Sequence, residues 1–407
     1  MRVLITTRIF PPEGHPSAVM ADELAEALAG EGWGVTVATG YPNHPYGRLF
    51  PSYVRRGVQV ERHNGFQVVR GWHLIHPSPA LLPRALVMAS QCTAFLAGAL
   101  KSRRPNVVVS YGPPLIGPLS SALIAKSLGA RLVTVIYDLY PDVAIEGGHL
   151  CHTGLIHLAR KIEKLVYQLS DKIVVISEGF RQTLLNGKGV EPHKVSVIPV
   201  WLDSRDIIPL NRDNSWRRQM NIPPDKFVVL YAGSIGLVSG AEVVVEAARL
   251  LESYPDILFV FVGEGQMKDR LEAQARNLGL TNMRFLSFQP RERLSEVQAT
   301  ADVSLVSLAP GRGRTSVPSK VLGYMAAARP VVASVDDGCD TAMVIQQAEC
   351  GHIVTPGRGQ DMAKAILAFY QSPTRRKACG KAGRRYFLHH FEKKIVLQKF
   401  IDLIKEC

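Results

Sequence analysis

A segment in the second half of the chain carries residue types that bind phosphate. Residues 310–334 read PGRGRTSVPSKVLGYMAAARPVVAS, so that Arg312, Arg314 and Lys320 surround a run of small residues. The pattern predicts an Ala-rich helix after this loop and then an apolar strand. Small residues let backbone approach a ligand closely, and a helix N-terminus flanked by cations favours an anion. The segment therefore indicates a diphosphate site, with a solvated loop before a packed helix as the alternative.

Polar residues also follow expected strands in the first half. Gly14 lies in the first strand-to-helix turn, where backbone could approach a ligand. Asn43 and His44 belong to a loop rich in rings and prolines, which suits a carbohydrate acceptor or is an inert turn. Asp138 and Asp142 follow a later apolar strand, and Asp138 could contact a sugar or orient an acceptor hydroxyl. Helix capping or a salt bridge would explain the same two carboxylates.

A glycine-rich turn opens the second half. Gly233, Gly236 and Gly240 give the spacing G-x-x-G-x-x-x-G between an expected strand and a helix, which is a weak dinucleotide fingerprint. Glu264 ends the next strand and could bind a ribose hydroxyl. A nicotinamide enzyme therefore stays possible from these residues alone. None of the twelve histidines has metal-ligand spacing, and we assign no metal site.

The 407 residues carry a formal net charge of +13, which favours anionic partners. No zinc-finger spacing, aromatic RNA-binding run or basic-leucine heptad accompanies this charge, so nucleic acid is not expected. An anionic membrane surface is one interpretation, and solvated surface charge is the other. Six cysteines without metal or disulfide spacing fit reduced thiols in a cytoplasm, and no signal peptide is visible. Pro83, Arg84 and Gln91 interrupt the apolar stretch 80–100, which argues against a membrane span.

Short apolar runs alternate with helical patterns twice along the chain. Strands are expected at 3–7, 34–39, 66–70, 107–110, 132–137, 172–176, 195–198, 227–232, 258–262, 283–285, 303–306, 331–333 and 351–354. Helices are expected at 17–29, 84–102, 118–128, 155–169, 241–253, 267–278, 291–300, 319–328, 361–370 and 372–385. This alternation predicts two doubly wound α/β domains of similar size, divided near the proline-rich segment 203–224. Ligands of such sheets bind at the carboxyl ends of the strands, so we expect a site in a cleft between the domains.

Several motifs in a fixed order resemble the retaining family-4 glycosyltransferases of the GT-B fold over nearly the whole chain. They are FPPEG at 10–14, VVISEGF at 174–180, VIPVWLD at 197–203, YAGSIG at 231–236, FVGEG at 261–265, ADVSLV at 301–306 and YMAAARPVVAS at 324–334. A narrower likeness to enzymes of bacterial surface polysaccharides, including fucosyl- and N-acetylfucosaminyl-type transferases, rests on PNHP at 42–45, DLYPD at 138–142 and VPSK at 317–320. The resemblance implies two Rossmann-like domains that face a central cleft. It implies an acceptor-binding domain at 1–205, a nucleotide-sugar-binding domain at 206–387, and a C-terminal helix at about 388–407 that packs back on the first domain.

The resemblance also implies an activity. A sugar would pass with retention from a nucleoside-diphosphate donor to a hydroxyl of a glycan or polyprenyl-linked acceptor, without metal or cofactor, in the cytoplasm or on the inner face of the cell membrane. The leaving diphosphate would accept the acceptor's proton. The residues assigned on this basis are Asp138, Arg314 and Lys320 for catalysis, Gly14, Gly233, Ser234, Glu264, Arg312, Thr315, Pro318 and Ser319 for the donor, and Asn43, His44 and Asp142 for the acceptor.

The chain departs from the family pattern at charged positions. The Arg and Lys that many members carry in the glycine-rich turn correspond here to Ser234 and Ser239, and two family glutamates correspond to Thr315 and Gly323. We infer that the cations at 312–320 meet the phosphate charge instead. Three rivals stay open: a GT-B-like sugar-nucleotide epimerase, a nicotinamide oxidoreductase, and a non-catalytic paralogue in a polysaccharide assembly complex.

Overall fold

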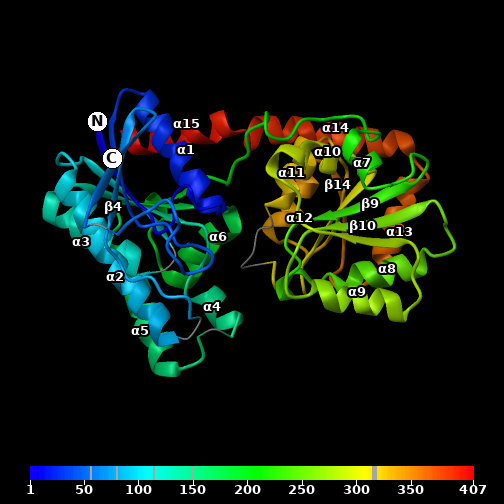
Figure 1. The fold of residues 1–407 in the computed structure, drawn as a ribbon, viewed down its shortest axis with the longest axis horizontal. Helices are drawn as coiled ribbons and strands as arrows, with labels where there is room; N and C mark the ends of the chain where they lie inside the picture. The colour runs from blue at the N-terminus through cyan, green and yellow to red at the C-terminus, as the bar shows by residue number, and fades with distance from the viewer. Residues whose placement is uncertain (56, 79–80, 113–114, 149, 314–318) are drawn as a thin grey trace. The chain divides into compact units, whose positions relative to one another are not determined.

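The computed structural model describes residues 1–55, 57–78, 81–112, 115–148, 150–313 and 319–407. The chain divides into two compact units: unit 1 comprises Met1–Pro199 and Leu397–Cys407, and unit 2 comprises Val200–Val396. Figure 1 shows the elements of both units in chain order. Unit 2 begins before residue 205 because the segment after Pro199 is bonded within it: the N–H of Leu202 donates to the carbonyl of Phe391 at 3.1 Å.

The described strands of unit 1 form a sheet in the order β3-β4-β2-β1-β5-β6-β7-β8. Their bounds are β1 Arg2–Thr6, β2 Gly34–Gly40, β3 Gln59–His63, β4 Phe66–Gly71, β5 Val107–Gly112, β6 Arg131–Ile136, β7 Lys172–Val175 and β8 Val195–Val197. All pairs are parallel except β3 with β4. In the central strand Leu4 lies opposite Thr36 on one side and Val108 on the other. The strand order reverses between β1 and β5, which places the switch point of this sheet there.

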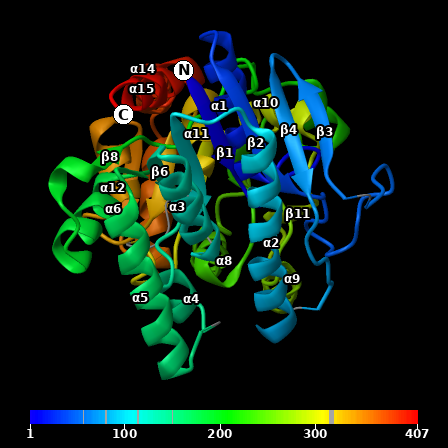
Figure 2. The same ribbon diagram turned by 90° about the vertical axis from the view of Figure 1, so that its left-hand side faces the viewer.

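Helices cover the sheet of unit 1. They are α1 Pro16–Gly30, α2 Leu81–Lys101, α3 Ile116–Leu128, α4 Asp142–Glu146, α5 Thr153–Leu169, α6 Glu178–Gln182, the π-helix η1 Thr183–Gly187 and the 3₁₀ turn η2 Pro192–Lys194. In Figure 2 the helices α2, α3 and α5 run across one side of the sheet. There Phe95 of α2 and Ala122 of α3 pack in one core with Leu4 and Val108 of the strands. The continuous apolar strands thus bury their side chains, as the parallel-sheet pattern predicts.

The apolar stretch 80–100 forms most of α2. No helix in the described ranges is long and apolar enough to cross a membrane. All six cysteines are free thiols.

The described strands of unit 2 are all parallel, in the order β11-β10-β9-β12-β13-β14. Their bounds are β9 Phe227–Ala232, β10 Ile257–Val262, β11 Met283–Leu286, β12 Val303–Ser307, β13 Val331–Ser334 and β14 Gly351–Val354. This is the Rossmann order, and its switch point lies between the neighbouring strands β9 and β12. The expected doubly wound α/β architecture is confirmed for both units.

Two cores lie on the two faces of the unit 2 sheet. The helical elements are α7 Ser215–Gln219, η3 Leu237–Ser239, α8 Glu242–Leu250, α9 Lys268–Asn277, η4 Arg291–Arg293, α10 Leu294–Ala299, α11 Lys320–Ala326, α12 Asp340–Gln347, α13 Gly359–Tyr370, α14 Pro373–His390 and α15 Lys393–Lys405, which continues into unit 1. Helices α8, α9 and α13 pack on one face with Val229 and Phe259. Helices α10, α11 and α12 pack on the other face with Val228 and Val260. Figure 1 shows α8 and α9 on one side of the strands and α10 and α11 on the other.

Some elements carry too little sequence signal to be predicted. Strand β3 is polar, and as the antiparallel edge strand it buries little. Helices α4, α6 and α7 are five residues each, shorter than one reliable period of apolar spacing. No helix was expected at α12, which buries Ala342 and Ile345 against the sheet.

Glycines let the loops at the carboxyl edge of unit 2 approach one another. A Cβ atom on Gly263 would lie 2.0 Å from the carbonyl oxygen of Gly233, and one on Gly265 would lie 2.3 Å from that of Ile235. The N–H of Ile235 in turn donates to the carbonyl of Glu264 at 2.9 Å. The turn after β9 is therefore pressed against the turn after β10, which fixes the backbone where a ligand would bind.

We predict that Gly263→Ala lowers the free energy of unfolding by roughly 1–3 kcal/mol, because the added methyl group must push backbone aside. Gly236→Ala is the matched control: nothing lies within 4 Å of its Cβ position, and its φ of −101° suits any residue. The control should stay within about 1 kcal/mol of wild type in urea unfolding. Equal stability of the two variants would show that the turns are not in close contact.

Candidate functional site

Lys320 lies at the carboxyl edge of the unit 2 sheet, at the first residue of α11. Its Nζ sits 3.6 Å from the centroid of the Tyr231 ring, in cation–π contact. Tyr231 is the fifth residue of β9 and is fully buried, and its hydroxyl donates to the carbonyl oxygen of Ser234 at 3.1 Å. The ring therefore forms a fixed floor beneath the ammonium group, beside the switch point between β9 and β12.

Burial lowers the pKa of Lys320 to about 7. No carboxylate among the described residues forms an ion pair with its Nζ. Desolvation disfavours the ammonium form, whereas a bound anion would favour it. Lys320 is thus a cation whose missing counter-charge a ligand can supply.

The glycine turn after β9 lies directly against this lysine. A Cβ atom placed on Gly233 would be 3.3 Å from Cε and 3.6 Å from Nζ of Lys320. The structure therefore brings together Lys320, which was assigned to catalysis, and Gly233, which was assigned to the donor. Ser234 is exposed in the same turn, and Ser319 is exposed directly before Lys320, without a side-chain cap to the helix.

Asp336 holds the loop that carries Arg312. Its two carboxylate oxygens accept the N–H groups of Gly311 at 3.0 Å and of Gly313 at 3.1 Å. Arg312 stands between these two glycines in the chain and is half-buried. Its own backbone N–H donates to the carbonyl of Ala309 at 3.1 Å. Arg314, Thr315 and Pro318, which the sequence also assigned to the site, lie outside the described residues.

Two of the positions that depart from the family pattern, Ser239 and Gly323, have structural roles. Ser239 is buried, and its hydroxyl donates to the carbonyl of Gly236 within the 3₁₀ turn. Gly323 is buried in α11, where a Cβ atom would meet Ile207 at 3.3 Å. Glu264 pairs with Lys268 at 2.8 Å, and this bond lowers its pKa, so the carboxylate stays ionised at the end of β10.

A hollow of about 570 Å³ opens beside the glycine turn. Leu237 and Gly240 line it from the turn, Glu242 and Glu246 from α8, and Ala309 from the loop after β12. The two carboxylates, together with Arg249 and Gln274, suit hydroxyl groups, which can donate to carboxylates and accept from the other two side chains.

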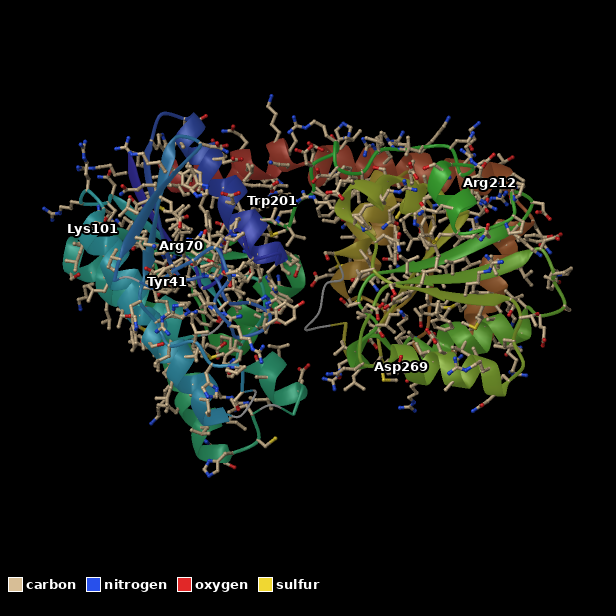
Figure 3. The ribbon with its side chains drawn as sticks, viewed as in Figure 1. Tyr41, Arg70, Lys101, Trp201, Arg212 and Asp269 are labelled. Atoms are coloured by element: carbon tan, nitrogen blue, oxygen red, sulfur yellow. The ribbon has the colours of Figure 1, made fainter. Side chains whose placement is uncertain are left out.

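In unit 1 a buried glutamate joins the loops after β1 and β2. One oxygen of Glu13 accepts the N–H groups of Asn43 at 3.0 Å and His44 at 2.8 Å, and the other accepts that of Phe10 at 3.1 Å. The side-chain amide of Asn43 donates to the carbonyl of Tyr41 at 2.8 Å and contacts Nε2 of buried His73 at 3.0 Å. Asn43 is therefore held by its neighbours. One of them, Tyr41, is labelled in unit 1 in Figure 3.

His44 and His15 form a small titratable cluster at this edge. Their rings meet edge to face with centroids 5.2 Å apart. Burial lowers both pKa values, and Arg8 lowers them further. Both histidines are therefore favoured in the neutral form, which can donate and accept hydrogen bonds from sugar hydroxyls. Gly14 directly follows Glu13 in the loop after β1. It is exposed, with nothing within 4 Å of its Cβ position.

The two aspartates after β6 differ in their surroundings. Partial burial raises the pKa of Asp138, which follows the end of the strand by two residues. Asp142 pairs with Lys188 at 2.6 Å, and the same Nζ pairs with the buried carboxylate of Glu163 at 3.0 Å. The salt-bridge interpretation thus applies to Asp142, and an acceptor role for it stays a prediction.

Sequence reasoning missed three residues that shape these edges: Glu13, Tyr231 and Asp336. Asp336 comes two residues after β13, so the rule that selected Asp138 would also have selected it. Glu13 and Tyr231 act through buried contacts that residue type alone does not reveal. In the described ranges no group of three or more His, Cys, Asp or Glu side chains could hold a metal ion.

Two family models match the chain. The Glycosyl transferase 4-like domain matches residues 17–201, and the Glycosyl transferases group 1 model matches residues 212–386. The order and extent of the two matches follow units 1 and 2.

Full-length relatives and solved structures agree with these matches. WcaI of Escherichia coli K12, named as a colanic acid biosynthesis glycosyl transferase, is 27% identical over 100% of both chains. WbjE of Pseudomonas aeruginosa, named as a glycosyltransferase, is 25% identical over 80% of this chain and 81% of its own. The crystal structure of Anabaena HepE in complex with UDP superposes with a TM-score of 0.71 at 14% identity, over 100% of both chains. With a 4-like N-terminal domain, a group 1 C-terminal domain and the GT-B architecture, the chain belongs to the group 1 glycosyltransferases.

Proposed function

We propose that this glycosyltransferase moves a sugar from a nucleoside-diphosphate donor to a hydroxyl of a glycan or lipid-linked acceptor, with retention, in the synthesis of a bacterial surface polysaccharide. The observation that carries the donor assignment is the ammonium group of Lys320, which lies against Gly233 and Tyr231 at the switch point of unit 2 and has no ion-pair partner among the residues that the structure describes. The name of WcaI, which refers to colanic acid biosynthesis, supports polysaccharide synthesis as the role. The UDP bound to HepE supports a nucleotide-linked donor.

Lys320 and Arg312 would neutralise the diphosphate. The bond between the anomeric carbon and the diphosphate oxygen breaks, and negative charge gathers on that oxygen. A fixed cation stabilises this charge better than mobile water does, because its orientation costs nothing at the moment of reaction. The backbone of Gly233 and Ser234 can approach the phosphates closely because position 233 has no side chain.

The acceptor would bind at the carboxyl edge of unit 1. Asn43 and His44 are fixed there by Glu13, and Asp138 presents a carboxyl group whose pKa is raised. In our proposal Asp138 orients the acceptor hydroxyl. The acceptor oxygen bonds to the anomeric carbon on the face that the diphosphate leaves, and the hydroxyl proton passes to the leaving diphosphate, which gives retention without a protein nucleophile. We also propose that the enzyme works in the cytoplasm, at the inner face of the membrane.

A panel of UDP- and GDP-sugars tests the function. The purified chain should release UDP or GDP in the presence of a polyprenyl-diphosphate-linked sugar, and proton NMR of the product should show the donor's anomeric configuration. An inverted product would contradict retention. Interconversion of a nucleotide sugar without acceptor would instead identify an epimerase.

We predict that Lys320→Met weakens UDP binding by about 10- to 100-fold, since a hydrogen bond to a charged group is worth about 1.5–3 kcal/mol. Methionine keeps most of the side-chain volume, so melting of the ligand-free protein should not fall. Lys364→Met, which removes an exposed cation of α13, is the control and should bind UDP like wild type in calorimetric titration. Unchanged UDP affinity in the Lys320 variant would remove this lysine from the site.

We also predict that UDP affinity falls as pH rises above 7. The free enzyme loses the Lys320 proton around its pKa of about 7, whereas bound diphosphate raises that pKa, so binding requires proton uptake above pH 7. A terminal phosphate with a pKa of about 6 is already ionised there. The dissociation constant should rise by up to tenfold per pH unit between about pH 7 and 8.5, and Lys320→Met should remove this slope.

A further inference from the structure

A basic groove lies on unit 2 at the edge opposite the donor site. It has a volume of about 640 Å³, and its floor is the segment Ala327–Pro330, which directly precedes β13. Asp302, the residue before β12, also lines it. The groove therefore opens at the amino ends of these strands, whereas Lys320 and Gly233 lie at the carboxyl edge. Its volume is that of a small-molecule site.

Cations dominate the groove. Six of its lining residues carry positive charge: Arg329, Arg376, Lys377, Lys381, Arg384 and Arg385. Five of them come from α14, where positions 377, 381, 384 and 385 repeat at helical spacing and so share one face. Lys377, Lys381 and Arg385 are exposed at the rim.

Backbone carbonyls fix the three inner arginines. Arg329 donates to the carbonyl of Leu210 at 2.6 Å, Arg384 to that of Ala326 at 2.7 Å, and Arg376 to that of Tyr370 at 3.0 Å. Arg376 and Arg384 each donate a second bond from the same nitrogen, to the carbonyls of Phe369 and Ile207. Each guanidinium has five N–H donors, so these two arginines keep three donors each that bond to no other described residue. Burial lowers the pKa of all three. They form a rigid, partly desolvated set of donors that need not be reordered to bind a ligand.

Among the described residues that line the groove, one carboxylate faces the six cations. This carboxylate, Asp302, is already bound: both oxygens accept from Arg212, at 2.8 and 2.9 Å, and one also accepts the N–H of Val228. Figure 3 labels Arg212 on unit 2. Asp302 attracts Arg329 and Arg376 electrostatically without an ion-pair contact, and Glu392 does the same to Arg384. Within the described part of the chain, no carboxylate forms an ion pair with any of the six cations.

Close packing gives the groove its shape. A Cβ atom on Gly380 of α14 would lie 2.2 Å from the carbonyl oxygen of Ala328, so only glycine lets this helix meet the floor. Pro209, Leu210 and Pro330 add apolar wall between the cations. The groove thus combines fixed guanidinium forks, mobile ammonium groups and apolar surface.

We propose that this groove binds a phosphate-bearing ligand, separate from the sugar donor. Guanidinium forks match phosphate oxygens in pairs, and the rim lysines add point charge. The apolar wall suits an attached carbon chain or ring. The phosphate can belong to a free metabolite or to the headgroup of an anionic lipid. This inference does not depend on the proposed donor site.

Pyrophosphate titration of the full chain tests the groove. Lys377→Glu/Lys381→Glu reverses two exposed charges at its rim, and Arg270→Glu/Lys364→Glu makes the same change at exposed positions of α9 and α13 outside it. Lys320→Met serves as the background because it removes the donor-site lysine, and calorimetry should still detect pyrophosphate binding there. When Lys377→Glu/Lys381→Glu, the rim variant, is added to this background, the affinity for pyrophosphate should fall at least tenfold. UDP affinity of the rim variant should equal that of the control. If the rim variant binds pyrophosphate as the control does, the proposal is wrong, whatever Lys320→Met shows for the donor.

Vesicles distinguish the source of the phosphate. Phosphatidylglycerol vesicles that sediment with the wild type and the control, but not with the rim variant, would identify a lipid headgroup. Pyrophosphate binding without sedimentation would identify a soluble phosphate. Equal sedimentation of all variants, together with equal pyrophosphate binding, would overturn the proposal.

Discussion

The proposed donor site depends on an ammonium group that forms no ion pair with any carboxylate in the described part of the chain. Lys320 stands on the ring of Tyr231 and beside Gly233, and burial holds its pKa far below that of a free lysine. Lys320 is partly buried and has no ion-pair partner among the described residues, which costs folding free energy, and a bound anion would offset that cost. The close turns at Gly263 and Gly265 support this arrangement, since they fix the backbone around the lysine.

In our proposal the chain binds a diphosphate without some of the charged residues that the resemblance implies for the family. Ser239 and Gly323, which the resemblance matches to charged family positions, are both buried in structural roles here. In our proposal the positive charge comes instead from Arg312 and Lys320. Asp336 ties down the loop that carries Arg312 through two backbone N–H groups. One strand-end carboxylate thus positions a cationic loop, without being a ligand itself.

Residue patterns alone predict the two parallel sheets, because buried parallel strands are continuous apolar runs such as FVVLYA at Phe227–Ala232. They do not predict β3, whose polar edge strand has no such run, or the α12 helix. In the site, residue type and strand-end position selected Lys320 and Gly233, which do meet in space. Residue patterns do not predict the roles of Tyr231 and Glu13, because those roles come from contacts between residues far apart in the sequence. Nothing local in the sequence shows that a strand tyrosine supports a lysine 89 positions later, or that a turn glutamate accepts N–H groups across two loops.

Direct titration of the Lys320 side chain tests the central claim. In the protein with isotope-labelled lysine, NMR chemical shifts of the Lys320 ammonium group, assigned by comparison with Lys320→Met, report its pKa. The account predicts a pKa of about 7 in the free enzyme, against 10.5 for an unperturbed lysine, and a rise when UDP binds. A value near 10.5 that UDP leaves unchanged would contradict it, because Lys320 would then be an ordinary solvated lysine.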